Sequence, residues 1–402
     1  MLITPALLQV KTHVGRGRQE LATRPVLRGT SELSLPDGIS ARELLSRLDV
    51  PVVQCGPEAT EWDCIRRDHC AMADAGEWDD VLEALRFADQ ERTMASGGRR
   101  VSHLISEGIR ARFLALLSKA DLAEARVELR RFEAVHALHV QDYAAAHLLA
   151  EVQIDLGLAL MSQAVEGDEG AAVVGEAASL IEAADGLLED FDAIEEMSPL
   201  LAASRYRLLP ALADGASLCR DWYEDWCDLD PEDVLAHGAH ADFLLELAGG
   251  TAAAFEKAAR RASVMTAEIT GKAAYAVFHL TAQGRLGAAL PNLDMEMLAQ
   301  GLMDFQAATG CQHRANVVAN LLAELLRGFR EAGPQAVSLV TKTREALSDV
   351  FLNRLQEVHL ESWTRGADGL ALTLREVFGP ALQRGARIQR AGGGLGARIP
   401  RG

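Results

Sequence analysis

The chain has 402 residues, enough for two or three compact domains or for one extended repeat array. Its 49% apolar and 24% charged residues are those of a globular protein, which excludes bulk disorder. The formal net charge of −18 excludes a broad nucleic-acid surface and predicts no binding to an anionic membrane leaflet, because like charges repel. Aromatic residues make up only 5%, so the core must be filled mainly by Leu, Ala and Val, which favours packed helices.

No run of about 18 uncharged apolar residues occurs, so the sequence predicts no membrane span. Near the N-terminus the basic residues follow the short apolar stretch, which is the wrong order for a secretory signal. Six cysteines in a chain of this length do not form a disulfide-dense scaffold. We therefore expect free thiols and a cytoplasmic location.

Residues 1–57 are interrupted by several Pro and Gly residues, so no long helix fits there. One short helix is expected, capped by Ser40 and covering Ala41 to Leu48, with Glu43 at the capping-box position. The stretch Leu7–Val14 has the pattern of a strand or an extended arm. This segment is the first of three predicted regions.

Residues 58–383 form the second region, in which apolar residues recur at three- and four-residue spacing. Helices are expected to begin near Trp62, Trp78, Val101, Leu122 and Tyr143. Gly76 should stop the first of these, and Asp121 should cap the fourth. The polar stretch 166–170 predicts a loop, and thus a break in the helical region.

Further helices are expected after this loop, and the sequence shows no alternating strand pair between 58 and 383. Asp230 should cap a helix that starts at Pro231, and Thr251 should cap one that ends at Gly271. The other helices are expected at 171–190, 199–213, 215–227, 272–284, 294–309, 312–331, 334–347, 349–363 and 370–383.

Residues 384–402 form the third region, a tail with five arginines and no Asp or Glu. It lacks apolar periodicity, so we expect it to be disordered. Gly392–Gly396 follows no predicted strand and opens no helix, which argues against a phosphate-binding loop. A basic tail can instead contact an acidic partner or nucleic acid, and a regulatory module whose tail contacts nucleic acid is one alternative.

The predicted helical pairs resemble tetratricopeptide-like repeat proteins of the uncharacterised bacterial kind. Trp62–Asp89 and Arg112–Leu158 each resemble a helical hairpin of that family, and Leu229-Asp230-Pro231 resembles its Asp-Pro boundary. The resemblance implies an all-α fold, a right-handed stack of antiparallel helical hairpins forming a tetratricopeptide-like α-solenoid. It also implies that the concave surface binds a peptide or another protein.

One cluster has the composition of a metal site. It consists of Glu133, His136, His139, His147 and Glu151, with Asp142 between them. Glu133 and His136 have the Glu-x-x-His spacing of di-iron helical bundles, and a chain turn near 140–142 would bring His147 to the same place. A di-iron site needs a second such pair, which the sequence lacks. The alternative is buried histidines that form ordinary hydrogen bonds near a helix end.

A second candidate cluster is aromatic and acidic. Trp222 and Trp226 share a helix face, and with Tyr223 they could form a cage for a basic residue of a partner. The simpler alternative is that the rings pack in the core. His237 and His240 are similarly expected in a packing seam. The possible zinc ligands Cys55, Cys64, His69 and Cys70 match no zinc-ribbon spacing.

The sequence contains no Gly-x-Ser-x-Gly, His-Glu-x-x-His or Walker motif, and no cofactor is expected. The leading hypothesis is therefore a non-enzymatic interaction scaffold whose groove binds another protein or peptide. The acidic surface favours a basic partner. A metal-binding protein or enzyme that uses residues 133–151 is the main alternative.

Overall fold

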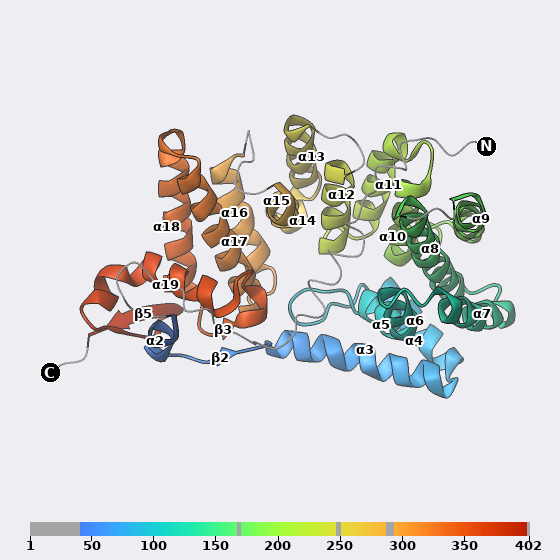
Figure 1. The fold of residues 1–402 in the computed structure, drawn as a ribbon, viewed down its shortest axis with the longest axis horizontal. Coiled ribbons are helices and arrows are strands. Elements are labelled where there is room, and N and C mark those ends of the chain that lie inside the picture. Colours follow the sequence, from blue (N-terminus) through green and yellow to red (C-terminus); the bar gives the residue numbers. More distant parts are fainter. Residues whose placement is uncertain (1–40, 167–169, 247–250, 287–292, 400–402) are drawn as a thin grey trace. The chain divides into compact units, whose positions relative to one another are not determined.

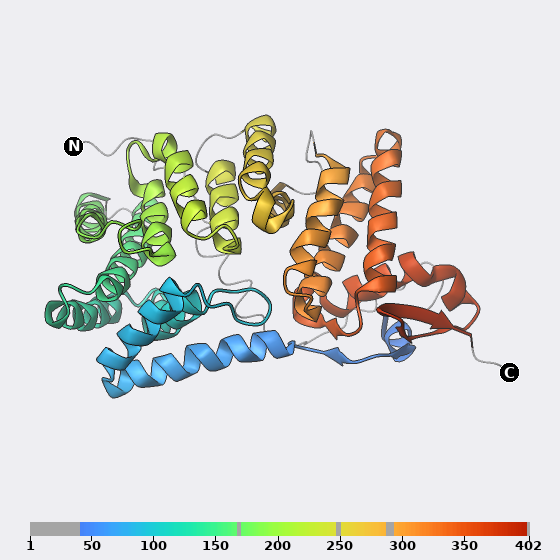
Figure 2. The same ribbon diagram turned by 180° about the vertical axis from the view of Figure 1, so that it is seen from behind.

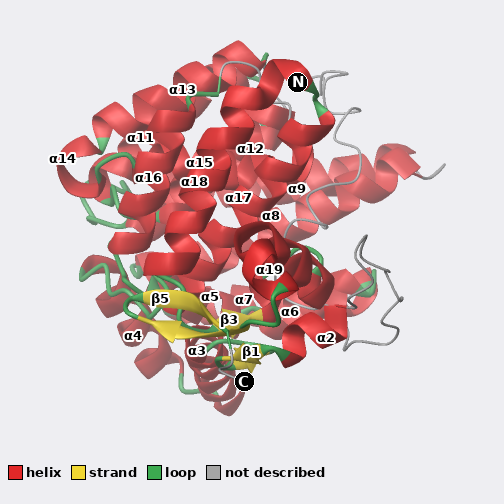
Figure 3. Cartoon of the chain, turned by 90° about the vertical axis from the view of Figure 1, so that its left-hand side faces the viewer, coloured by secondary structure: helices red, strands yellow, loops and turns green. Residues whose placement is uncertain are grey.

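The computed structural model describes residues 41–166, 170–246, 251–286 and 293–399. Over these residues the chain is predominantly α-helical, which confirms the expected helical class (Figures 1 and 3). The predicted arm at Leu7–Val14, the Ser40 cap and part of the predicted loop at 166–170 lie outside the described residues. The chain divides into two compact units, which are described separately.

Unit 1 comprises the described residues of 62–95 and 99–250. Its helices are α3 (Pro57–Ala75, whose first residues belong to unit 2), α4 (Trp78–Gln90), α5 (Val101–Ile109), α6 (Ala111–Ser118), α7 (Leu122–Leu138), α8 (Tyr143–Glu166), α9 (Gly170–Glu189), α10 (Pro199–Leu208), α11 (Gly215–Leu229) and α12 (Val234–Glu246). A 3-10 turn, η2 (Leu209–Ala211), follows α10. Gly76 stops α3 with a φ of 82°, and the Asp121 side chain caps α7, both as predicted.

Helix α8 forms the centre of unit 1, where α7, α9 and α10 pack against it. Its first turns carry small side chains, Ala144, Ala146 and Ala150, which are fully buried and allow neighbouring helices to approach closely. Tyr143–Gln163 is long and apolar enough to cross a membrane by length and composition. However, 78% of its apolar window is buried inside the structure, which is the behaviour of a core helix.

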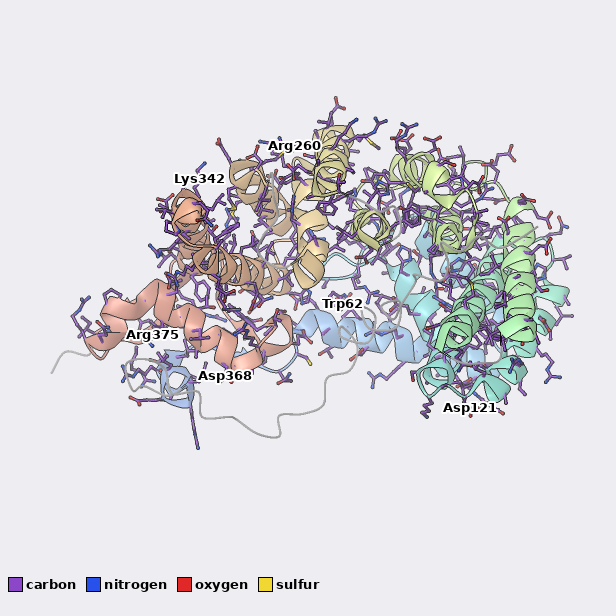
Figure 4. All side chains as sticks on the ribbon, turned by 45° about the horizontal axis from the view of Figure 1, so that its top comes forward. Trp62, Asp121, Arg260, Lys342, Asp368 and Arg375 are labelled. Atoms are coloured by element: carbon purple, nitrogen blue, oxygen red, sulfur yellow. The ribbon has the colours of Figure 1, made fainter. Side chains whose placement is uncertain are left out.

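Unit 2 comprises the described residues of 26–61, 96–98 and 251–402. Its helices are α2 (Ala41–Ser46), α13 (Ala252–Met265), α14 (Ala267–Thr270), α15 (Ala273–Leu286), α16 (Met295–Ala307), α17 (Gln312–Glu331), α18 (Val337–Asn353) and α19 (Gly366–Gln383), with 3-10 turns η3 (Pro334–Ala336) and η4 (Leu360–Ser362). Helices α16, α17 and α18 lie side by side (Figure 2). Arg260 and Lys342 are exposed on α13 and α18 (Figure 4).

Short strands join the two ends of unit 2. Strand β1 (Leu48–Asp49) pairs in parallel with β4 (Arg387–Ala391), which pairs antiparallel with β5 (Gly394–Arg398). Strand β2 (Val52–Val53) pairs in parallel with β3 (Val358–His359). Residues near 50 are thus bound to residues near 360 and 390.

The prediction of a disordered tail is wrong for residues 387–398, which form the hairpin β4–β5. Ile388 and Leu395 are buried, and Gly392 supplies the turn with a φ of 62°. Arg387 pairs with Asp49 on β1, so a charge that suggested a solvated tail belongs to a sheet. With one buried apolar side chain in each strand, the hairpin has too little alternation to be recognised from sequence.

The predicted helix at 349–363 is also wrong. Helix α18 runs on to Asn353, and the chain then forms β3 and η4. Side chains from the first turns of α17 hold this segment extended. Gln312 accepts hydrogen bonds from the Gln356 and Glu357 amides, and Asn316 accepts one from the His359 amide. These partners are more than 40 residues away along the chain, so local sequence could not reveal them.

The helix predicted to start at Pro231 instead starts at Val234. The Asp230 carboxylate is held by the buried Arg100, whose Nε and Nη2 donate to its two oxygens at 2.6 and 2.5 Å. Near the start of α12 the capping role falls to Asp233, because its side chain accepts a hydrogen bond from the Leu235 amide at 3.0 Å. The helix expected to begin near Val101 ends at Ile109, and a separate helix, α6, follows after Arg110.

Candidate metal centre

The structure does not gather the predicted metal cluster of unit 1. Glu133 is exposed and His136 partly exposed on α7, and His139 Nε2 lies 3.8 Å from Asp79 on α4. His147 and Glu151 are instead buried on α8. Among the described residues, no three of these five side chains meet as metal ligands would.

His147 and Glu151 belong to a closed polar network. The two ring nitrogens of His147 lie 2.9 Å from Ser106 Oγ and 2.8 Å from Ser204 Oγ. Ser204 donates to Glu151 at 3.0 Å, and Arg110 Nη2 lies 2.8 Å from the other oxygen of that carboxylate. Burial lowers the pKa of His147 to about 3, although Glu151 opposes the shift. The ring is therefore neutral and fully used by protein partners.

The predicted partner-binding aromatics are mostly core residues. Tyr223 and Trp226 are 2% and 3% exposed, so they cannot form a cage for a partner, and that prediction is corrected. The Trp226 indole donates to Asp233 at 3.2 Å. Trp222 is partly exposed, and the Arg205 guanidinium lies 5.3 Å from its ring centroid.

The two nearby histidines pack with these rings, as expected for a packing seam. Tyr223 donates to His237 Nδ1 at 2.8 Å and stacks on His240 with ring centroids 4.1 Å apart. The Tyr206 hydroxyl forms a hydrogen bond with His240 Nδ1 at 2.7 Å. Burial lowers the pKa of His237 to about 4 and that of His240 to about 3. Both histidines are thus neutral core residues.

Unit 2 holds a group of metal-ligating side chains that the sequence analysis missed. His313 lies in the first turn of α17, His359 on β3 and Glu361 in η4, and one ligand atom of each lies within 4.8 Å of the others. Glu58, in the first turn of α3, adds a second carboxylate beside His359. Four elements thus converge on one point, which we call the His313–His359 centre.

The distances within the centre are too long for hydrogen bonds. Glu58 Oε2 lies 3.9 Å from His359 Nδ1, and His313 Nδ1 lies 4.0 Å from Glu361 Oε1. Ligands that bind zinc at 2.0–2.2 Å in a tetrahedron are about 3.4 Å from one another, so small side-chain rotations suffice to place an ion between them.

Two of the converging atoms are buried without a protein partner. His359 is 0% exposed and Glu58 is 4% exposed. Within the described part of the chain, His359 Nδ1 and Glu58 Oε2 make no hydrogen bond. An unsatisfied buried polar atom costs about 1–3 kcal/mol, and more when it is charged, so such a pair indicates that something further binds there.

The surroundings orient the proposed ligand atoms. His359 Nε2 lies 2.9 Å from Glu357 Oε1, the arrangement by which an outer carboxylate fixes a metal-bound imidazole. Glu58 Oε1 accepts the His313 amide at 3.3 Å, which holds its second oxygen toward His359. The Gly56 amide donates to Glu361 Oε1 at 3.2 Å.

Gly56 covers the centre at very close range. A Cβ at this position would lie 2.4 Å from His359 Nδ1 and 2.7 Å from Glu58 Oε2, so any larger residue would force the ligands apart. Burial lowers the pKa of His313 despite the opposing carboxylates of Glu361 and Glu58. A neutral imidazole is the form that binds a metal.

The sequence carried one local signal of this centre. Glu357, His359 and Glu361 alternate with apolar residues, a pattern that puts three ligand-type side chains on one face of an extended segment. The helix predicted at 349–363 would place the His359 side chain on a different face from the other two, so that prediction hides the alternation. Glu58 and His313 are 255 residues apart, so no spacing rule could join them.

No family model, no curated protein and no solved structure matches this chain. Its function is therefore inferred from the chemistry of its own residues.

Proposed function

We propose that this protein binds one divalent transition-metal ion, with zinc as the best fit, at the His313–His359 centre. His313 Nδ1, His359 Nδ1, Glu361 and Glu58 would be the ligands. The observation that supports the proposal best is the pair of buried atoms, His359 Nδ1 and Glu58 Oε2, that face each other without a hydrogen bond to any described residue. A cation satisfies both at once.

The ligand set favours zinc over the common hard cations. Calcium and magnesium prefer six or more oxygen ligands, whereas two imidazole nitrogens and two carboxylates suit four-coordinate zinc. Iron and manganese also accept histidine–carboxylate sets, so they are the competitors to be tested. Four protein ligands fill a tetrahedron, which is the arrangement of a structural rather than a catalytic zinc.

Metal analysis of untagged full-length protein tests the proposal. The protein is stripped with a chelator, dialysed against limiting zinc, iron or manganese, and measured by mass spectrometry. We expect about one zinc per chain, retained against the competing ions. His359→Ala and Glu58→Gln should weaken zinc binding at least about tenfold, since each removes a ligand.

Glu133→Gln and His136→Ala are the matched controls, because they change the same residue types in unit 1 without touching the centre. They should bind zinc like the parent. Less than about a tenth of an ion per chain, or equal binding by the His359 and Glu58 variants, would overturn the proposal.

We also propose, as a second function, the interaction scaffold that the sequence favours. The sequential packing of α7 on α8, α8 on α9 and α10 on α11 supports a stack of helical hairpins, and the charge of −18 supports a basic partner. An array of basic peptides probed with the protein should then retain it in a salt-dependent manner. Absence of retention at low salt would count against this function.

A further inference from the structure

The ligands of the His313–His359 centre come from distant parts of the chain. His313, His359 and Glu361 lie on the C-terminal part of unit 2. Glu58 ends a separate stretch, Leu48–Glu58, which we call the docking segment. This segment contains β1, β2 and the start of α3. A metal bound by all four side chains would cross-link the docking segment to the rest of unit 2.

Apart from the metal centre, the docking segment is held by two short strand pairings and by the exposed ion pair of Asp49 with Arg387, which adds little stability. Each of its strands pairs with its partner over two residues only. The side chains of Val52 and Val53 are exposed, as are those of Gln54 and Cys55. Such short pairings add little stability unless a buried apolar face supports them.

The buried residues of the docking segment are those of the metal centre. Between Leu48 and Glu58, only Gly56 and Glu58 are buried, and all residues there are described. Gly56 carries no side chain to bury, and Glu58 buries a carboxylate. In most segments an apolar side chain supplies the anchor, but here the anchor is an acidic group whose burial costs free energy without a counter-charge.

Negative charge concentrates at the same point. Glu357 lies 2.9 Å from His359 Nε2, and Glu58 lies on the other side of the same ring. Glu361 approaches His313 from η4. Arg390 Nη2 lies 3.7 Å from Glu357, so Glu58 and Glu361 are the carboxylates whose mutual repulsion a divalent cation would turn into attraction.

We propose that the metal controls docking of the segment Leu48–Glu58, which is bound to unit 2 when zinc is present and released when zinc is removed. The inference rests on the proposed metal binding and adds a regulatory consequence to it. Because only the docked form offers all four ligands, zinc shifts the equilibrium toward docking by its preference for that form. The segment would thus report zinc availability by becoming ordered.

Hydrogen–deuterium exchange of the wild-type full chain, with and without zinc, tests this directly. Three amides report on docking: Gly56 donates to Glu361, Val358 to Pro51, and Glu361 to Gln54. At zinc about 100-fold above its dissociation constant, their exchange should slow by up to about 100-fold. Leu298 on α16 is the internal control, and its amide should exchange equally in both samples.

Equilibrium dialysis of the same samples separates the two proposals. Stoichiometric zinc with unchanged exchange at Gly56, Val358 and Glu361 would refute controlled docking and leave metal binding intact. No bound zinc would refute metal binding itself, and controlled docking with it. Glu58→Gln adds a further check: it should retain weaker zinc binding through the other three ligands but lose most of the zinc-dependent protection. Full protection in Glu58→Gln would overturn the docking mechanism.

Discussion

Acidification from pH 7 to pH 5 should destabilise unit 1 strongly. Three buried histidines, His147, His237 and His240, are 2%, 3% and 4% exposed, and burial lowers their pKa values to about 3, 4 and 3. In the unfolded chain each ring takes up a proton near its ordinary pKa of about 6.5. Their contribution to stability is therefore full above pH 6.5 and is lost as the pH falls toward the folded pKa values.

The magnitude follows from linkage. Each histidine's contribution to the free energy of unfolding falls by about 1.4 kcal/mol per pH unit below 6.5, or by about 2 kcal/mol at pH 5. The three contributions together fall by about 6 kcal/mol. Asp89 opposes this change, because burial raises its pKa to about 6. Between pH 7 and pH 5 the folded protein therefore binds a proton at Asp89, which offsets about 1 kcal/mol of the loss in stability. His103, whose pKa is raised beside Asp233 in spite of burial, opposes it too. A net loss of several kcal/mol is large against the typical stability of about 5–15 kcal/mol.

Urea unfolding at pH 7, 6 and 5, followed by tryptophan fluorescence, measures the effect. Four of the five tryptophans lie in unit 1, so the signal reports mainly on that unit. His240→Phe should remove about 2 kcal/mol of the pH dependence, even though it costs stability at pH 7 by removing the hydrogen bond between Tyr206 and His240. His136→Gln, on a partly exposed ring, is the control. A free energy that stays flat from pH 7 to 5, or an unchanged slope in His240→Phe, would refute the reasoning.

Two further predictions concern the packing of unit 1. Trp226→Ala should lower the free energy of unfolding by about 3–5 kcal/mol because it opens a cavity in the core. Trp222→Ala should lower it by only about 1 kcal/mol, since its ring is partly exposed beside Arg205. Similar losses in both variants would contradict the assigned burial. Arg207→Met should cost about 3–5 kcal/mol, since it removes one of the two guanidinium groups that pair with the buried Glu151 and Asp155. A loss below about 1 kcal/mol in urea titrations would contradict this expectation.

Most of the helical core could be predicted from the period of the apolar residues. The prediction at 312–331 coincides with α17, and the caps at Asp121 and Thr251 are confirmed, because each depends on residues within a few positions of the helix end. The predicted stack of helical hairpins depends on contacts between helices, and the period of the apolar residues carries no information about those contacts. It stays a prediction.

The errors occur where a distant side chain determines the backbone. Arg100 holds the Asp230 carboxylate 130 residues away, and Gln312 accepts amides from the segment after α18. In both places the local sequence pattern favours a helix, but a hydrogen bond to a distant residue determines the backbone conformation that is observed. The hairpin at 387–398 was missed for the related reason that its pairing partner β1 lies near residue 48.

The same logic explains why a metal centre was expected in the wrong place. In unit 1, Glu151 and Asp155 face Arg110 and Arg207, and His147 bonds two serines, so every group has a protein partner and an ion would have to displace one.

At the His313–His359 centre the composition is similar, but the arginine that reaches it, Arg390, lies 3.7 Å from the outer carboxylate of Glu357 and does not pair with Glu58. Within the described residues no Lys or Arg pairs with Glu58, and Gly56 packs over His359 too closely to admit a side chain that could. Buried carboxylates need compensation by charge or hydrogen bonds. We propose that a metal ion, which is small enough to fit between these atoms, supplies the positive charge. Within the described residues, the lack of a Lys or Arg beside Glu58, more than the presence of histidine, therefore distinguishes the proposed metal centre from the structural network.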